Sequence, residues 1–213
     1  LNHAVHHIDM LNWLEGKLPV KIQAMFTNVM HDNAEVEDLS LANLKYADGS
    51  LAQVVSSVVH HGEEQGISLQ CANAKLSFPW SVKAETGTSN GFYEPEGNQE
   101  LIQQIQAQYD ALPSLQYEGH TGEIDNILLS LESGQAPLIT GQDGRRTVEL
   151  ISAIYKAACT EETISLPLAP ADPFYTFNGL LNHAVRFHQK TGHIENFSTS
   201  KISLGNYSKQ KES

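Results

Sequence analysis

The order of hydrophobic patterns along the chain constrains its fold more than any other feature. Alternating or continuous apolar runs typical of β-strands come first, at 21–30, 39–46, 51–60, 66–72, 74–78 and 81–86. After a loop rich in glycine, serine and asparagine at 86–98, apolar residues recur at helical spacing in 99–112, 121–134 and 145–158. Strands followed by helices indicate the α+β class, so we predict an open, mainly antiparallel β-sheet with helices packed on one face.

Two local signals refine this prediction. Residues 2–15 have the pattern of an amphipathic helix that ends at Gly16. The Asp48-Gly49 pair lies between the apolar runs 39–46 and 51–60, which predicts a β-hairpin and therefore antiparallel pairing there.

The opening helix carries polar side chains that can form a site. At about 100° per residue, its apolar residues form one stripe facing the core, and a second row on nearly the opposite side contains Asn2, His6, Asp9 and Trp13. Asp9, one turn after His6, can orient and charge-stabilise the imidazole, which suits proton transfer near neutral pH. Two alternatives stay open on spacing alone: ordinary surface polar residues with Asn2 as a helix cap, or a metal site with His3 and His7, or His6 and Asp9, as ligands.

Composition excludes several classes of function. The formal charge of −12 and the absence of any lysine and arginine block argue against nucleic acid as a partner. The two cysteines, Cys71 and Cys159, lack disulfide-framework or zinc-finger spacing, which favours a reducing cytoplasm. No apolar run approaches the roughly 20 residues of a membrane span, so we expect no membrane partner. No third strong ligand lies at a diagnostic spacing from the histidines of the opening helix, so we expect no resident metal.

Four stretches in order resemble the C-terminal domain of the Gfo/Idh/MocA family of oxidoreductases. The first is NHAVHHIDMLNWLEG at the N-terminus, and the others begin at Val36, Glu118 and Ile164. Together they cover nearly all of residues 1–173. We therefore expect 1–173 to be the family's α+β substrate and oligomerisation domain, and 174–213 to be a helical and then weakly ordered tail outside the resemblance.

The resemblance implies an NAD(P)-dependent oxidoreductase that transfers hydride between nicotinamide and a hydroxyl of a sugar, sugar nucleotide or cyclitol. It implies His6 as the catalytic residue, with Asn2, Asp9 and His120 on the substrate side. Many members carry aspartate at the position of Asn2, so the amide leans the match toward sugar-nucleotide dehydrogenases. The open sheet of the family often forms the oligomer interface, so a homodimer or homotetramer is expected.

The sequence departs from the family in one large respect. It contains neither a G-x-G-x-x-G pattern nor a Glu-Lys-Pro tripeptide, which the family carries in a Rossmann domain that binds NAD or NADP. We therefore expect this chain alone to be inactive. The alternatives are a non-catalytic sugar-binding or oligomerisation module and, less favoured, a histidine-rich metal hydrolase.

Overall fold

The computed structural model describes residues 1, 4–62, 65–93 and 97–192 of the 213-residue chain. It forms two compact units, one from the described residues of 1–64 and 139–213 and the other from 65–138. All strands pair antiparallel, and helices accompany them, so the predicted α+β class with open antiparallel sheets is confirmed.

The first unit is built on a four-stranded sheet in the order β3-β2-β1-β7. Its strands are β1 (Lys21–Thr27), β2 (Leu39–Lys45), β3 (Leu51–Ser57) and the short β7 (Ile164–Ser165). The predicted hairpin joins β2 to β3: Gly49 takes a φ of 91°, and its N–H donates to the carbonyl of Tyr46 at 3.1 Å. The strands predicted within 66–86 do not continue this sheet. They pair among themselves in the second unit.

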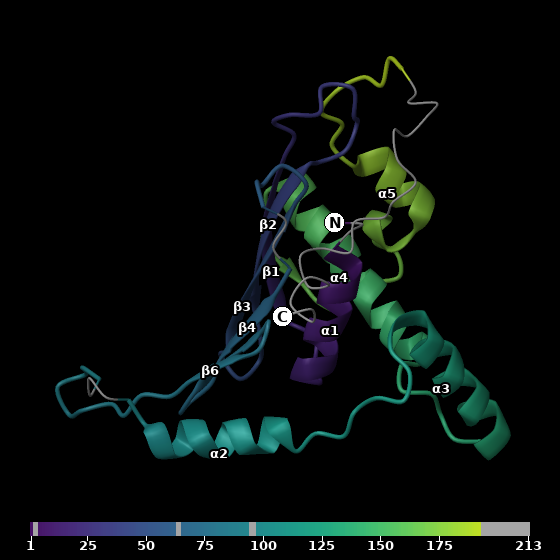
Figure 1. Ribbon diagram of the computed structural model, residues 1–213. Helices are drawn as coiled ribbons and strands as arrows, with labels where there is room; N and C mark the ends of the chain where they lie inside the picture. The colour runs from purple at the N-terminus through teal and green to yellow at the C-terminus, as the bar shows by residue number, and fades with distance from the viewer. Residues whose placement is uncertain (2–3, 63–64, 94–96, 193–213) are drawn as a thin grey trace. The chain divides into compact units, whose positions relative to one another are not determined.

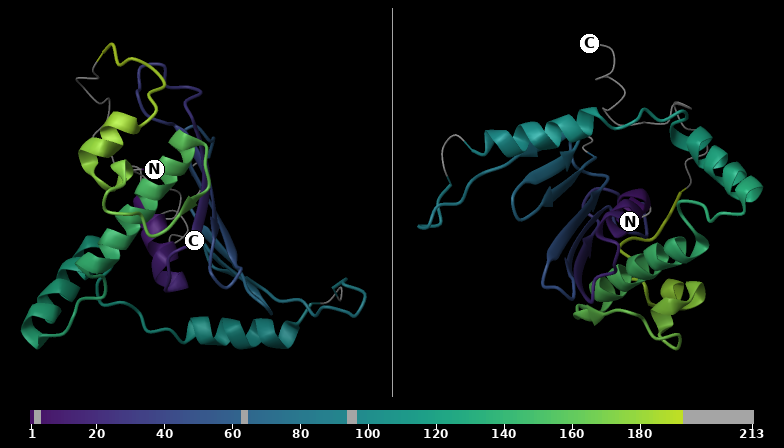
Figure 2. Two further views of the ribbon diagram at one scale, coloured as in Figure 1. Left: turned by 180° about the vertical axis from the view of Figure 1, so that it is seen from behind. Right: turned by 90° about the horizontal axis from the view of Figure 1, so that it is seen from below.

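Helices cover one face of this sheet (Figure 1). The long α4 (Gly141–Thr160) packs on β1, and α1 (Val5–Glu15) packs on α4. The two further views show the same helices on the same face of β1, β2 and β3 (Figure 2). A short 3₁₀ turn (Pro173–Tyr175) and α5 (Phe177–His183) complete the unit.

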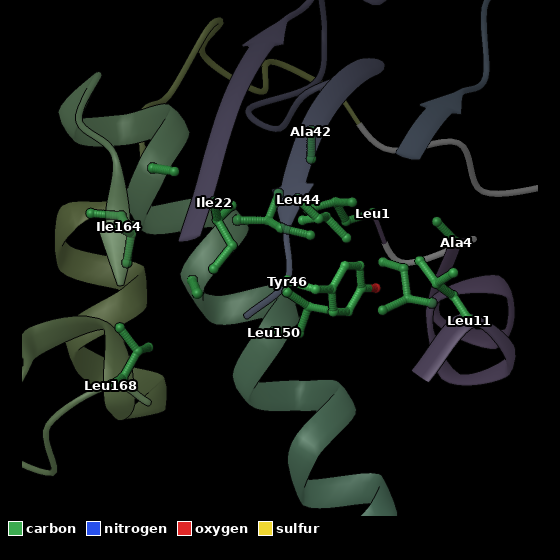
Figure 3. Packing of buried hydrophobic residues seen from close by; sticks show 14 residues of the cluster. Leu1, Ala4, Leu11, Ile22, Ala42, Leu44, Tyr46, Leu150, Ile164 and Leu168 are labelled. Carbon is green, nitrogen blue, oxygen red and sulfur yellow. The ribbon is translucent and has the colours of Figure 1, made fainter. Parts of the chain in front are cut away.

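The core of the first unit lies between the sheet and these helices (Figure 3). Ile22 and Leu44 from the sheet meet Leu150 from α4 and Leu11 from α1 around the ring of Tyr46, which is buried. Every second residue of β2 is buried, as expected for a strand with one covered face. The core therefore fixes which side of α1 faces away from the protein interior.

The structure moves the start of one predicted helix. We expected a helix over 145–158, but α4 begins at Gly141. Thr140 and Asp143 form a capping box, in which each side chain bonds the backbone N–H of the other, and this holds the first turn despite its two glycines. The consequence is that Asp143 and Arg146 project from an ordered helix.

Part of the C-terminal segment lies against the first unit. Arg186 Nη1 donates to Glu35 Oε1 at 2.7 Å, and the N–H of Phe187 donates to the Glu35 carbonyl at 3.0 Å. The side chain of Asn33 bonds the backbone of Gly192 in both directions. The described part of this segment therefore contacts the loop between β1 and β2 of its own chain.

The second unit contains the other sheet and two helices. Its strands, in the order β4-β5-β6, are β4 (Ile67–Gln70), β5 (Lys75–Phe78) and β6 (Ser81–Lys83). The helices are α2 (Gln99–Asp110) and α3 (Gly119–Ser133). Trp80 stacks on Tyr109 of α2 with ring centroids 3.9 Å apart, and its Nε1–H donates to Gln106. None of the helices in the described part of the chain is long and apolar enough to span a membrane.

Candidate functional site

The first predicted site residues lie on α1. The helix ends at Gly16, whose φ of 65° suits glycine and whose N–H donates to the Asn12 carbonyl at 2.9 Å. Ile8 and Leu11 are buried in the core, so the row predicted opposite to them points outward. His6 is exposed and Asp9 is half-buried, one turn apart on that outward side. Asn2 lies outside the described residues.

Asp9 is held by a partner from another helix. Its Oδ1 accepts a hydrogen bond from Thr147 Oγ1 at 2.6 Å, and Thr147 on α4 is itself buried. We expected Asp9 to orient the imidazole of His6, but no bond between these two side chains occurs among the described residues. The structure therefore fixes the carboxylate against α4 and leaves the imidazole free to meet a ligand.

Thr147 also connects Asp9 to Asn12. Asn12 Nδ2 donates to Thr147 Oγ1 at 3.2 Å, so the three side chains form a relay that runs from the amide through the hydroxyl to the carboxylate. Asn12 Oδ1 is buried and has no hydrogen-bond partner within the described part of the chain. A buried acceptor without a donor is costly, so it marks a place where a ligand or water can bind.

These side chains open onto a pocket of about 330 Å³ within the first unit. It lies beside the C-terminal half of α1 and the first turns of α4. Its lining residues are Asp9, Asn12, Trp13, Gly16, Lys17, Leu18, Ile139, Asp143 and Arg146. Its volume is at the small end of the range for ligand sites.

The charged groups of this pocket are mostly paired with each other or with neighbours. The Lys17 ammonium bonds the Asp48 carboxylate, and this bond raises the pKa of Lys17 and lowers that of Asp48. Asp143 accepts from the N–H and hydroxyl of Thr140 and lies 3.5 Å from Arg146 Nη1. These bonds, those from Thr140 first, lower the pKa of Asp143.

His120 lies in the second unit, on the first turn of α3. Its side chain is exposed, and its Nδ1 is 3.1 Å from Glu123 Oε2. A separate pocket of about 510 Å³ in this unit is lined by residues that include Asn73, Glu85 and Tyr93, but not His120. Among the described residues, the side chain of His120 bonds only Glu123.

Sequence reasoning missed Thr147, Asn12 and the pocket residues of α4. One signal was present for Thr147: it occupies the same helical stripe as Leu150 and Ile154, at i, i+3 and i+7, which puts a polar side chain on the core-facing side of the helix. A buried hydroxyl needs a hydrogen-bond partner, and the partner of Thr147 is Asp9, which lies 138 positions away in the sequence. Spacing alone does not reveal such a pairing.

The chemistry available at the site is acid–base and hydroxyl-binding. His6 offers an accessible imidazole, and Asp9, one turn further along α1, offers a carboxylate that Thr147 holds in place. In the parts of the chain that the structure describes, no group of three histidine, cysteine, aspartate or glutamate side chains is placed to hold a metal ion.

Residues 1–77 match the family model described as the GFO/IDH/MocA C-terminal domain. This match agrees with the resemblance identified in the sequence over residues 1–77. No curated protein matches the chain.

Many solved structures share the fold. The WlbA dehydrogenase of Bordetella pertussis, in complex with NADH and UDP-GlcNAcA, aligns at 20% identity with a TM-score of 0.56, covering 79% of this chain and 45% of the other. The aldose-aldose oxidoreductase of Caulobacter crescentus, complexed with glycerol, aligns at 19% identity with a TM-score of 0.54, covering 76% of this chain and 46% of the other. The myo-inositol 2-dehydrogenase of Lactobacillus plantarum aligns at 17% identity with a TM-score of 0.51, covering 76% of this chain and 47% of the other. At these identities the likeness establishes the fold, and the chain spans about half the length of each structure.

Proposed function

Because residues 1–77 match a GFO/IDH/MocA C-terminal domain, we propose that this chain is the substrate-binding and proton-transferring domain of an NAD(P)-dependent oxidoreductase. Its substrate is a hydroxyl of a sugar, a sugar nucleotide or a cyclitol. The observation that carries the proposal is the placement of His6: an accessible imidazole one turn before a carboxylate that Thr147 fixes in place. The alternative, a non-catalytic sugar-binding or oligomerisation module, would need none of this acid–base arrangement.

The proposed chemistry of this chain is a proton transfer. In the direction of oxidation, a ring nitrogen of His6 takes the proton of the substrate hydroxyl while its carbon loses a hydride. In reduction, the imidazolium returns the proton to the carbonyl oxygen. Asp9 accepts a hydrogen bond from a neighbouring hydroxyl of the substrate and so orients the substrate beside His6. The bond from Thr147 keeps the carboxylate from rotating away.

NAD or NADP is the proposed hydride acceptor, but the described residues do not form a place for it. Dinucleotides bind at the glycine-rich turn of a parallel βαβ unit, whereas every strand pair here is antiparallel. We therefore assign cofactor binding mainly to a separate nicotinamide-binding domain, and we assign no residue of this chain to it.

Two further predicted residues belong to the proposal. Asn2 lies four residues before His6, where an amide can bond a substrate hydroxyl without adding negative charge. His120 is exposed in the second unit, which leaves its ring available for substrate contact. A cytoplasmic location is also part of the proposal, supported by two free cysteines, Cys71 and Cys159.

We also propose that two copies of the chain associate through the uncovered face of the four-stranded sheet. Met25, Leu41 and Val55 are directly opposite one another on β1, β2 and β3, and each is at least 41% exposed. A row of three neighbouring apolar side chains on a sheet face is typical of an interface. A second copy is the partner that a two-fold axis would bring to the same row.

The function is tested by following the formation of reduced nicotinamide. The chain, linked to a nicotinamide-binding domain, is incubated with NAD or NADP and with a panel of hexoses, disaccharides, UDP-sugars and inositols. We expect turnover with at least one class of substrate. If cofactor binding is verified by titration and no member of the panel is oxidised, the non-catalytic alternative is favoured instead.

A further inference from the structure

We propose that the pocket beside Trp13 binds a second, uncharged ring of the substrate, so that the site is built for a disaccharide or a glycoside rather than a single sugar. The place of the first ring, at His6, rests on the proposed function above. The pocket itself is a feature of the first unit and is argued from its own side chains.

The helix places the pocket in line with His6. His6 and Trp13 are seven residues apart, so they differ by only about 20° around α1 and are separated by about 10 Å along it. Asp9 lies between them and lines the pocket. A ligand that extends along the outward side of α1 from His6 therefore reaches Trp13 with its second ring.

Two acceptors of the pocket are available to a ligand. Asn12 Oδ1 is buried without a partner within the described part of the chain, and Asp9 uses only Oδ1 in its bond to Thr147. Sugar hydroxyls are donors that satisfy such groups. Because the Thr147 hydroxyl holds both side chains, the acceptors are already in position before a ligand binds.

Trp13 supplies the apolar part of the site. It is 57% exposed and lines the pocket, whereas the chain's other tryptophan, Trp80, is stacked on Tyr109. An exposed indole face at a polar pocket fits the C–H face of a sugar ring, which is flat and apolar. Packing against Tyr109 accounts for the position of the Trp80 ring, whereas the exposed ring of Trp13 has no such stacking partner among the described residues.

The charges favour an uncharged ring over a phosphate. The pocket carries two acids, Asp9 and Asp143, and two bases, Lys17 and Arg146. Lys17 already bonds Asp48, and Arg146 lies beside Asp143. The N-terminus of α4, which would otherwise attract an anion, is occupied by the capping box of Thr140 and Asp143.

The two tryptophans provide a test with an internal control. The 213-residue chain is labelled with ¹⁵N, and its two indole N–H signals are assigned with Trp80→Phe. The chain is titrated with cellobiose, lactose, maltose, glucose, inorganic phosphate and UDP. We expect at least one disaccharide to shift the Trp13 signal saturably and leave the Trp80 signal unchanged. Glucose should bind about tenfold or more weakly, which corresponds to about 1.4 kcal/mol.

A matched pair of substitutions locates the binding. Asn12→Ala removes the unpaired acceptor and should weaken the disaccharide about tenfold or more, while Trp13 still reports. Asn43→Ala, on the exposed face of β2, should change nothing. If Asn12→Ala does not fold, Asp9→Asn replaces it, because the amide oxygen can still accept from Thr147 while the negative charge is lost.

The proposal is overturned if no disaccharide shifts Trp13, if glucose binds as tightly as the disaccharides, or if phosphate or UDP alone shifts the signal. It is equally overturned if Asn12→Ala and Asn43→Ala have the same effect. None of these measurements uses a cofactor or hydride transfer. A failure here therefore leaves the proposed role of His6 standing, and a failure of His6 in turnover leaves this binding result standing.

Discussion

Asp9 on α1 and Thr147 on α4, 138 positions apart in the sequence, are joined by a hydrogen bond of 2.6 Å from the Thr147 hydroxyl to the Asp9 carboxylate. This bond connects the helix that carries the candidate site to the helix that packs on the sheet. In the described part of the chain no bond joins Asp9 to His6, so the carboxylate is positioned by its contact with α4 and not by the imidazole.

Replacing Thr147 with valine tests how much this bond stabilises the fold. Valine has nearly the same shape but leaves a carboxylate oxygen and an amide without their partner, so we expect the free energy of unfolding to fall by about 1–3 kcal/mol. Urea denaturation measures it. Thr163→Val is the matched control, because its bond to Gln23 is exposed and should contribute well under 1 kcal/mol. Equal losses in the two variants would contradict this account.

The strand and helix patterns were sufficient to predict the fold class and most elements of the first unit. The hairpin at Asp48-Gly49 and the outward row of α1 depend on local geometry, which short sequence stretches determine. The separation of 66–86 into a second sheet was not predicted, because an alternating pattern shows that a strand has a buried face but does not show which strand it pairs with.

The candidate site was predictable only in part for the same reason. His6 and Asp9 could be placed on one side of a helix from their spacing alone. The bond from Thr147, the pocket and the unpaired oxygen of Asn12 depend on how α1 and α4 pack, which involves residues far apart in the chain. The stripe formed with Leu150 was the only local sign that Thr147 enters the core.

The buried carboxylate of Asp38, which bonds the loop between β1 and β2, makes the folding stability depend on pH in the acidic range. Asp38 is only 4% exposed. Its carboxylate accepts hydrogen bonds from the N–H groups of Val29 and Met30, and its Oδ2 lies 3.1 Å from His31 Nδ1. Burial raises the pKa of Asp38, but these bonds outweigh it and lower the pKa below its ordinary value. Its contribution is therefore present above the unfolded pKa of about 4 and is lost as the pH falls through the lower folded pKa.

Asp38→Asn should lower the free energy of unfolding at neutral pH by about 1–3 kcal/mol, because the amide accepts fewer of these bonds. It should also flatten the loss of stability below about pH 4. Chemical denaturation across that pH range measures both. Asp32→Asn, exposed in the same loop, is the control and should leave the free energy of unfolding at neutral pH close to that of the wild type, because no hydrogen bond of the described residues involves its side chain. The account is wrong if the two variants behave alike.

Tyr46 and Tyr155 should respond in opposite ways to loss of the hydroxyl. The Tyr46 hydroxyl is buried without a partner among the described residues, and burial raises its pKa to about 12. Tyr155 donates to Glu37 Oε1 at 2.7 Å. We expect Tyr46→Phe to change the free energy of unfolding by between zero and a gain of about 1 kcal/mol, and Tyr155→Phe to lower it by about 1–2 kcal/mol. Thermal denaturation of both variants checks the difference, and a larger loss for Tyr46→Phe would refute it.

The exposed row on the sheet predicts self-association. Light scattering should find at least a dimer at micromolar concentration, and Met25→Lys should shift it to a monomer because a lysine would be buried opposite the partner's apolar row. Met30→Lys is the matched control, since Met30 is similarly exposed, at 67% against 74%, but lies outside the strands. A folded wild-type chain that remains monomeric would exclude the interface.

The central claim is that His6 is the proton-transferring residue, and steady-state hydride transfer tests it most directly. The chain, linked to a nicotinamide-binding domain, is assayed with a sugar or sugar-nucleotide substrate as wild type, His6→Ala and His7→Ala. His6→Ala should lower kcat by about 10² to 10⁴ while cofactor binding and thermal stability stay near wild type, and His7→Ala should cost far less. If His6→Ala keeps near-normal turnover while His7→Ala abolishes it, the assignment of the catalytic histidine is contradicted.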